Sequence, residues 1–380
     1  MKIGVITFHF VHNQGALLQC YALQKVLNNL GHEPYVIDYR PAYHEVRYSA
    51  KKNPFVMAHN NWVKQHNKGV TRKLYAAARG FVRAIRMTIN KDDAVNDKLF
   101  NDFIETHFNL TSRYRSYGQL VKNPPNMGCY IAGSDQLWNP ELCDQKLNPA
   151  YFLMFGTKST LRIAYAVSLK ESFSISEKND LKRYCEVIDY ISVREKNSDL
   201  LEVTDKDIEI CIDPTLLLQQ CDYSPIESTI ITDDPYIFVY GFETSPTMIE
   251  AIREISEYYK IRVINGSPTR IKLDIEAENV FNYAPDQFLS FIHGACYVVT
   301  NSFHGTAFSL IYHKQFTTVL HQSRGQRMRD LLEKVGLSNR IYDNKKSDYA
   351  NKIDYNNVDI KLAALREHSI EFLKRTTFNY

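Results

Sequence analysis

A histidine stands between two apolar segments in the stretch VVTNSFHGTAFSLIY, residues 298–312. Residues 297–300 are typical of a short buried strand, and the apolar residues of 307–311 repeat at helical spacing. His304 is therefore predicted in a strand-to-helix turn, where main-chain N–H groups point outward and can hold an anion. Histidine can donate or accept a proton near neutral pH, so this turn could combine anion binding with acid–base chemistry.

A second polar turn, HFVHNQGALLQ, follows the first apolar segment of the chain. Asn13, Gln14 and Gly15 open a helix there, and its free N–H groups suit a phosphate or a sugar hydroxyl. The turn lacks the three glycines of a dinucleotide site and the Lys-Ser/Thr of a P-loop, which disfavours NAD and ATP. A plain tight turn is the alternative, and a metal site at His9 and His12 is disfavoured.

The stretch IAGSDQLWNP, residues 131–140, also ends a strand with polar side chains. Asp135 and Gln136 could bind sugar hydroxyls while Trp138 stacks on a pyranose face. Equally, Asp135 could cap a helix and Trp138 could belong to the core.

Arginines supply the cations. Arg194 closes the predicted strand YISVR, where a guanidinium could bind a carboxylate or phosphate bidentately, although a surface pair with Glu195 is the alternative. Downstream, one or two arginines are expected to point into the same cleft and the others to be solvated: Arg324, Arg327, Arg329 and Arg340.

Predicted strands alternate with helices along the chain, which indicates parallel sheets joined by crossover helices. The fold class predicted is α/β, with two Rossmann-like domains whose parallel sheets face a cleft. We expect an N-terminal domain over 1–220, with a basic helical insertion at about 44–110. A C-terminal domain over 221–345 carries the His304 turn, and a helix within 346–380 packs back on the N-terminal domain. Ligands bind beyond the carboxyl ends of such strands, where the polar turns fall.

Composition places the chain among ordinary globular proteins, with 44% hydrophobic and 23% charged residues over 380 positions. No apolar run approaches the roughly 20 residues of a membrane span, and the start is too short for a signal peptide. The seven cysteines are scattered and form no CxxC pair, as expected of reduced thiols. We therefore expect a cytoplasmic protein without a metal site.

Charge is concentrated in residues 44–91, which hold eleven Lys and Arg against one Glu. Within it, TRKLYAAARGFVRAIRMTIN is two-faced at helical spacing, with arginines on one side and apolar residues on the other. One interpretation is a helix lying on an anionic membrane. The other is an ordinary surface helix whose apolar face packs on the body. The charged face lacks interleaved aromatics, so nucleic acid is not an expected partner.

Taken together, these segments resemble the polysaccharide pyruvyl transferase family. The matching segments occur in order along the chain: GALLQCYALQKVL, AGSDQLWNP, IAYAVSL, SVREK, DPTLLL, TNSFHGT and RMRDLLEKVGL, then Arg340. The resemblance implies a GT-B-like fold and transfer of pyruvate from phosphoenolpyruvate to sugar hydroxyls in a bacterial surface polysaccharide or exopolysaccharide precursor. It also implies that an arginine in the position of Arg194 and a histidine in the position of His304 contact the donor.

From the resemblance and the turns we expect His304 and Arg194 to be catalytic. The donor site would add Ser302, Arg327 and the amides of Gly305 and Thr306. The acceptor, a sugar or lipid-linked glycan, would be held by Asn13, Gln14, Gly15, Asp135, Gln136 and Trp138. No cofactor is expected besides phosphoenolpyruvate as donor substrate.

One residue departs from the family pattern. Many members carry an arginine two residues before the histidine, where this chain has Ser302. Arg324 or Arg327 could replace that charge. Two alternatives stay open: a GT-B glycosyltransferase using a nucleotide sugar, and a non-catalytic glycan-binding relative.

Overall fold

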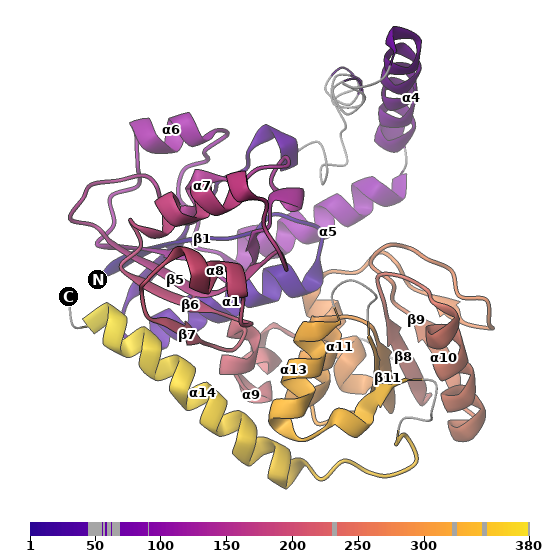
Figure 1. Cartoon of the computed structure of the whole chain (residues 1–380). Coiled ribbons are helices and arrows are strands. Elements are labelled where there is room, and N and C mark those ends of the chain that lie inside the picture. Colours follow the sequence, from indigo (N-terminus) through magenta and orange to yellow (C-terminus); the bar gives the residue numbers. More distant parts are fainter. Residues whose placement is uncertain are drawn as a thin grey trace.

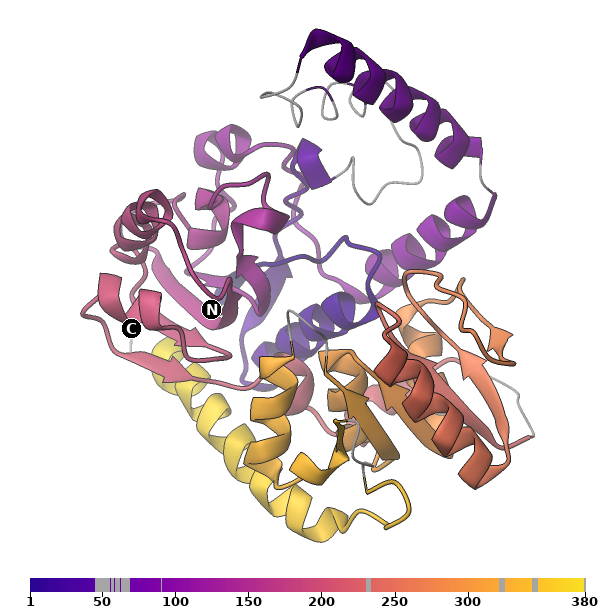
Figure 2. The same ribbon diagram turned by 45° about the vertical axis from the view of Figure 1, so that its right-hand side comes forward.

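The computed structural model describes residues 1–44, 69–89, 91–229, 234–320, 325–343 and 348–378, together with Phe55, Ala58 and Trp62. Two parallel sheets form two lobes (Figures 1 and 2). The predicted α/β fold with two parallel sheets is therefore confirmed.

The first sheet has the order β2-β1-β3-β5-β6-β7, and β4 pairs with β5. Every pairing is parallel. Its strands are β1 (Lys2–Ile6), β2 (Glu33–Val36), β3 (Cys129–Ala132), β4 (Asp135–Trp138), β5 (Leu161–Leu169), β6 (Tyr190–Val193) and β7 (Ile208–Ile210). All nine residues of β5 are buried, as expected of a central strand covered on both faces.

Helices surround this sheet. They are α1 (Gln14–Asn29), α5 (Lys91–His107), α6 (Tyr117–Lys122), α7 (Ile175–Cys185) and α8 (Ser198–Val203), with the 3₁₀ turns η1 (Pro140–Leu142) and η2 (Pro149–Phe152). The start of α7 shows how local sequence sets a boundary. Ser174 and Glu177 each accept a hydrogen bond from the other's main-chain N–H, which forms a capping box.

The second sheet has the order β10-β9-β8-β11-β12-β13, again all parallel. Its strands are β8 (Tyr236–Tyr240), β9 (Arg262–Asn265), β10 (Glu278–Asn279), β11 (Tyr297–Thr300), β12 (Gln315–Val319) and β13 (Ile341–Tyr342). Its helices are α10 (Pro246–Tyr259), α11 (Pro285–Gly294), α12 (Phe303–Ile311) and α13 (Gln326–Val335), followed by η5 (Ser338–Arg340).

The two sheets are joined by η3 (Pro214–Leu217), α9 (Gln220–Tyr223) and η4 (Ser224–Ile226). The predicted domain division at about residue 220 falls in this connection. The apolar pattern of IEICID predicts a strand over 208–213, but in the structure β7 ends at Ile210 and Asp213 caps η3 instead.

The last helix, α14 (Tyr355–Phe378), lies along both lobes (Figures 1 and 2). On the first lobe, Ser369 Oγ accepts from the Ile212 N–H at 3.1 Å, and Thr377 hydrogen-bonds His32. On the second lobe, the Tyr355 hydroxyl donates to the Ser309 carbonyl at 3.2 Å. The C-terminal helix therefore packs on the N-terminal lobe and also on the second lobe.

The basic segment forms the predicted helix, α4 (Val70–Ile89). It extends from the start of α5, away from both lobes, in both views (Figures 1 and 2). The expectation that its apolar face packs on the body is wrong for the side chains described, because Val70 and Leu74 are 65% and 58% exposed. The other basic residues of the segment, 45–54 and 63–68, lie outside the described residues.

Candidate functional site

Arg194 is the centre of a buried polar cluster at the carboxyl edge of the first sheet. It directly follows β6, and its Nη2 lies 2.8 Å from Asp213 Oδ2 in an ion pair whose side chains are 4% and 0% exposed. The same nitrogen donates to the Ser134 hydroxyl, which follows β3. The segments after β3, β6 and β7, at one edge of the parallel sheet, thus bring together three residues far apart in sequence. The alternative of a surface pair with Glu195 is not what the structure shows.

His304 reaches this cluster from the second lobe. It is the second residue of α12, after Ser302, whose hydroxyl accepts from the Gly305 N–H at 3.4 Å. Its Nε2 lies 3.7 Å from Asp213 Oδ2, so one carboxylate faces both the arginine and the histidine. The Arg194 guanidinium also lies 5.0 Å from the centre of the Phe303 ring.

Asp213 stays ionised because of its partners. Burial alone would raise the pKa of this carboxyl, but Arg194, His304 and Thr215 outweigh burial and hold the pKa well below its usual range. Its other oxygen accepts from the Thr215 N–H at 2.9 Å and hydroxyl at 2.7 Å. A fixed negative charge therefore orients the arginine and faces the histidine.

Several buried polar atoms of this region have no hydrogen-bond partner among the described residues. They are Arg194 Nε, His304 Nε2 and Glu195 Oε2. Buried polar groups are nearly always hydrogen-bonded, and those that are not call for an explanation such as a ligand. The guanidinium can donate a hydrogen bond, the imidazole can donate or accept one, and the carboxylate can accept one. Because these three groups lie in adjoining segments, they indicate a binding site for a polar, anionic molecule.

A cavity of about 1060 Å³ lies beside this cluster, between the lobes. The first lobe contributes residues in or after β4, β5 and β6: Gln136, Asn139, Lys170, Glu195 and Asn197. Helix α13 of the second lobe contributes Gln326, Arg327 and Asp330. Arg327 reaches across to donate to the Ser168 hydroxyl at 3.4 Å, and that hydroxyl donates to Glu195. The lining is rich in amides and carboxylates, which suit sugar hydroxyls.

The first predicted acceptor turn joins the lobes instead of lining this cavity. Asn13 caps α1, accepting from the Ala16 N–H at 3.1 Å. Gln14 is 3% exposed and bonds across the lobes, donating to the Tyr283 carbonyl at 3.3 Å and accepting from the Tyr240 hydroxyl at 3.2 Å. The space that Gly15 leaves is filled by His304, because a Cβ on this glycine would lie 2.1 Å from the imidazole Cγ.

The residues of the second predicted acceptor turn have different surroundings in the structure. Gln136 lines the cavity, as an acceptor residue should. Asp135 begins β4 at φ 92° and accepts from the Gln136 N–H at 2.7 Å, so it caps no helix. Trp138 requires correction: it is 0% exposed, stacks on Phe152 at 4.5 Å and donates to the Tyr151 carbonyl at 3.0 Å. Packed in the core, its ring has no free face for a sugar.

The amides expected to bind the donor are also engaged within α12. The Thr306 N–H donates to the Ser302 carbonyl at 3.0 Å, and the Gly305 N–H faces the Ser302 hydroxyl. Both residues are buried, so the helix cap satisfies these groups and they do not face a ligand.

The downstream arginines differ in their exposure and in whether they line the cavity. Arg327 lines the cavity, Arg329 is exposed, and Arg324 lies outside the described residues. Arg340 is 1% exposed and donates to the Asn351 carbonyl. The expectation that it would be cleft-lining or solvated is wrong, because the chain end folds over it.

The histidines of the first turn have separate partners. His9 Nε2 lies 3.0 Å from Asp38, and His12 Nε2 lies 3.0 Å from Asp97. Burial lowers the pKa of His9. In the described ranges no three His, Cys, Asp or Glu side chains are placed to hold a metal ion, and the seven cysteines form no disulfide there.

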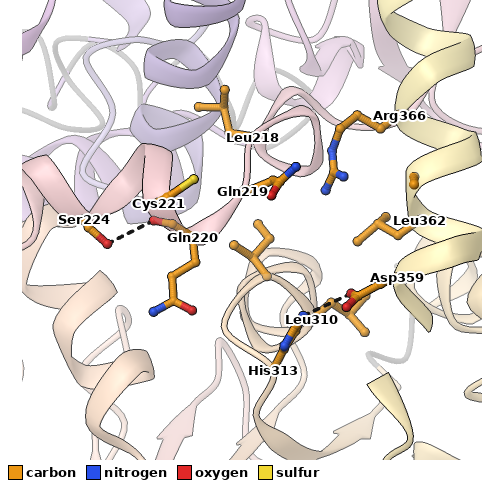
Figure 3. A pocket seen from close by; sticks show the side chains of 12 residues that line it. Leu218, Gln219, Gln220, Cys221, Ser224, Leu310, His313, Asp359, Leu362 and Arg366 are labelled. Atoms are coloured by element: carbon orange, nitrogen blue, oxygen red, sulfur yellow. Dashed lines mark hydrogen bonds and ion pairs between the residues drawn. The ribbon is translucent and has the colours of Figure 1, made fainter. Parts of the chain in front are cut away.

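A second cavity, of about 540 Å³, is lined by residues of the 218–224, 310–313 and 359–366 segments (Figure 3). It is bounded by the α9 segment, the end of α12 and α14. Arg366 projects toward it while its Nε donates to the Leu216 carbonyl at 3.0 Å, and His313 pairs with Asp359 at 3.0 Å. This cavity shares α12 with the Arg194–Asp213–His304 cluster.

Comparison with known proteins identifies the class. A model of the family "Polysaccharide pyruvyl transferase" matches residues 13–323. The chain therefore belongs to the polysaccharide pyruvyl transferase family, a family of transferases. A search of curated proteins finds no match.

Solved structures with a related arrangement include a UDP-GlcNAc 2-epimerase from Methanocaldococcus jannaschii in complex with UDP-GlcNAc and UDP, at 13% identity and TM-score 0.44, covering 98% of this chain and 99% of that one. A putative UDP-N-acetylglucosamine 2-epimerase from Listeria monocytogenes has 10% identity and TM-score 0.42, covering 99% and 90%. An alpha-glucosyltransferase in complex with UDP and DNA has 8% identity and TM-score 0.45, covering 98% and 92%.

Sequence reasoning missed Asp213, Ser134 and Ser168. The signal for Asp213 was present, because DPTLLL follows a strand and Asp before Pro commonly caps a turn. Ser134 stood within the predicted turn IAGSDQLWNP, but only the sheet order shows that it lies beside Arg194.

Proposed function

We propose that this chain transfers pyruvate from phosphoenolpyruvate to hydroxyls of a sugar in a surface polysaccharide or its precursor, with release of phosphate. The observation that carries the proposal is the group of unpartnered buried atoms, Arg194 Nε and His304 Nε2, beside the ionised Asp213. A guanidinium already fixed by a buried carboxylate needs no reorganisation to receive a carboxylate or phosphate.

The donor would lie between the two lobes. Arg194 would hold its carboxylate or phosphate, and Arg327 would supply a second cation from α13. Ser302 caps α12 and brings no charge, so Arg327 would replace the cation that many family members carry at that position.

His304 would act as acid or base. Attack of a sugar hydroxyl at C2 of the donor forms a C–O bond while the methylene carbon takes a proton, and a second hydroxyl then displaces phosphate to complete the ketal. His304 Nε2 would supply the proton to the methylene carbon or assist the departing phosphate.

The acceptor would occupy the cavity between the lobes, with Gln136, Asn139 and Asn197 binding its hydroxyls. Glu195, whose Oε2 lacks a partner among the described side chains, would accept the hydroxyl proton. This arrangement replaces Trp138 and the Asn13–Gly15 turn as the acceptor site. The acceptor would be lipid-linked, and the protein would bind it in the cytoplasm, at the inner face of the membrane.

Thermal stability with phosphoenolpyruvate tests the donor. At about 100 times its Kd a ligand stabilises the folded protein by about 2.7 kcal/mol, which is readily measured as a rise in Tm. Wild type should respond, whereas His304→Ala and Arg194→Lys should not.

His293→Ala is the matched control, because this histidine is 46% exposed at its side chain and pairs with Glu227 on the surface. It should respond like wild type. A response to UDP-GlcNAc but not to phosphoenolpyruvate would refute the proposal and favour a glycosyltransferase.

A further inference from the structure

Helix α4 is an element that the proposed reaction does not use. It is 20 residues long, which corresponds to about 30 Å, and it stands away from both lobes (Figures 1 and 2). It extends from the start of α5, the long helix that leads back to the first lobe.

One face of α4 exposes large apolar side chains. Val70, Leu74 and Val82 are 65%, 58% and 49% exposed, and Tyr75 at the border of this face is 66% exposed. Phe81 is half-buried, with its ring 5.4 Å from that of Phe55, itself 75% exposed. Such side chains occur singly on most surfaces, and their gathering on one helix marks an interaction surface.

The opposite face is basic. Arg72 and Arg79 are exposed on it. Helix α4 contains no Asp or Glu at all. Neither Arg72 nor Arg79 forms an ion pair with an acidic residue of the described part of the chain.

We propose that α4 lies on an anionic lipid surface, with its apolar face inserted among the acyl chains and its arginines at the headgroups. An apolar face, a strongly basic opposite face and a low mean hydropathy are the properties of helices that lie in the plane of a membrane. The charge of α4 also favours an anionic surface over a second copy of this helix, because two copies that each carry five basic and no acidic residues would repel each other.

No described helix is long and apolar enough to cross a membrane, and α4 itself carries four arginines and a lysine. The contact is therefore peripheral. Each basic residue near an anionic surface contributes about 1 kcal/mol, or about fivefold in partitioning, and the contribution declines as salt screens it.

Vesicle co-sedimentation tests the proposal, using phosphatidylcholine vesicles with and without 30% phosphatidylglycerol. We expect wild type to sediment with the anionic vesicles and not with phosphatidylcholine alone. Arg72→Gln combined with Arg79→Gln should weaken binding about 25-fold, from two charges at about fivefold each. Leu74→Glu should weaken it at least about tenfold, because a charge would enter the acyl region.

The matched control is Ile360→Glu, which places the same charge at a 71% exposed apolar position of α14. It should bind vesicles like wild type. Because all the substituted side chains are exposed, each variant should keep the thermal transition of wild type, so lost binding cannot be ascribed to unfolding.

Three results would overturn the proposal: no sedimentation of wild type with anionic vesicles, equal sedimentation with neutral ones, or Leu74→Glu binding within about twofold of wild type. Sedimentation velocity without vesicles identifies the alternative occupant. A wild-type dimer that Leu74→Glu converts to monomers would assign the face to a second copy. None of these readouts requires the donor or acceptor, so the proposed function can fail while this inference holds, and the reverse.

Discussion

Replacing Asp213 by Asn should destabilise the protein by about 3–5 kcal/mol at pH 7, which is the usual cost of leaving one charge of a buried pair uncompensated. The two side chains of the Arg194–Asp213 pair are 4% and 0% exposed, so solvent screens neither. Asn keeps an oxygen for Thr215, but its amide cannot balance the guanidinium, and a donor would face a donor. The expected loss therefore comes mainly from the charge.

Urea unfolding at pH 7, followed by circular dichroism and tryptophan fluorescence, measures the loss. The matched control is Asp180→Asn, which removes an exposed ion pair with Arg183 whose side chains are 62% and 42% exposed. Exposed pairs contribute about 0–1 kcal/mol, so this variant should unfold nearly as wild type does. A loss below about 1 kcal/mol for Asp213→Asn would refute the buried pair, because Arg194 would then have to reach solvent.

The pH dependence gives an independent check. Folding lowers the pKa of Asp213 below that of an unfolded aspartate, about 3.9. Its contribution is therefore complete above about pH 4 and is lost as the pH falls toward the folded-state pKa. The difference between wild type and Asp213→Asn should be constant from pH 6 to 8 and shrink below about pH 4. A difference that grew on acidification would contradict the assigned ionisation.

Other substitutions test single contacts. Gly15→Ala should abolish the response to phosphoenolpyruvate in thermal denaturation, because the added Cβ would lie 2.1 Å from the His304 ring and displace it; an unchanged response would show that the ring is free to move. Trp138→Phe should lower stability by about 1–3 kcal/mol through a lost buried hydrogen bond and leave the donor response intact. The opposite result, full stability with altered ligand binding, would show that the Trp138 indole belongs to the binding site and not to the core. A disulfide reagent should modify Cys221 and Cys296 quickly in the native protein and reach the five buried cysteines only after denaturation; more than two fast thiols would contradict the packing.

The strand-to-helix turn of His304 could be predicted because its signals are local. The predicted strand 297–300 ends at a polar turn and a helical repeat begins directly after it, and the structure places α12 from Phe303. The parallel arrangement followed for the same reason, since buried strands alternate with helices along the chain.

Asp213 could not be assigned a role in the same way. The apolar pattern of the segment IEICIDP continues through Ile212, so the pattern predicts a strand that includes Asp213. In the structure β7 ends at Ile210. Its role depends on residues 19 positions before it and 91 after it, Arg194 and His304, and only the sheet order and the meeting of the lobes bring these together.

Trp138 and α4 show the opposite limit, where a pattern is clear but its surroundings are not. An aromatic after a polar turn fits both a sugar platform and a core residue, and the stacked ring of Phe152 decides for the core. The periodicity of α4 predicted a helix with one apolar face. Whether that face is covered depends on the angle at which the chain leaves α5, and no local sequence signal sets that angle.

The position of α14 restricts how substrates can enter. This helix is anchored to the first lobe through Ser369 and Thr377 and to the second through Tyr355, while Gln14 also links the two lobes. Wide separation of the lobes would break the Gln14 contacts and detach α14 from one lobe, so exchange of substrate and product should proceed by a small rotation about η3. The C-terminal helix thus holds the two lobes together. A chain cut before Tyr355 would lose the alignment of His304 with Arg194 even though both residues remain.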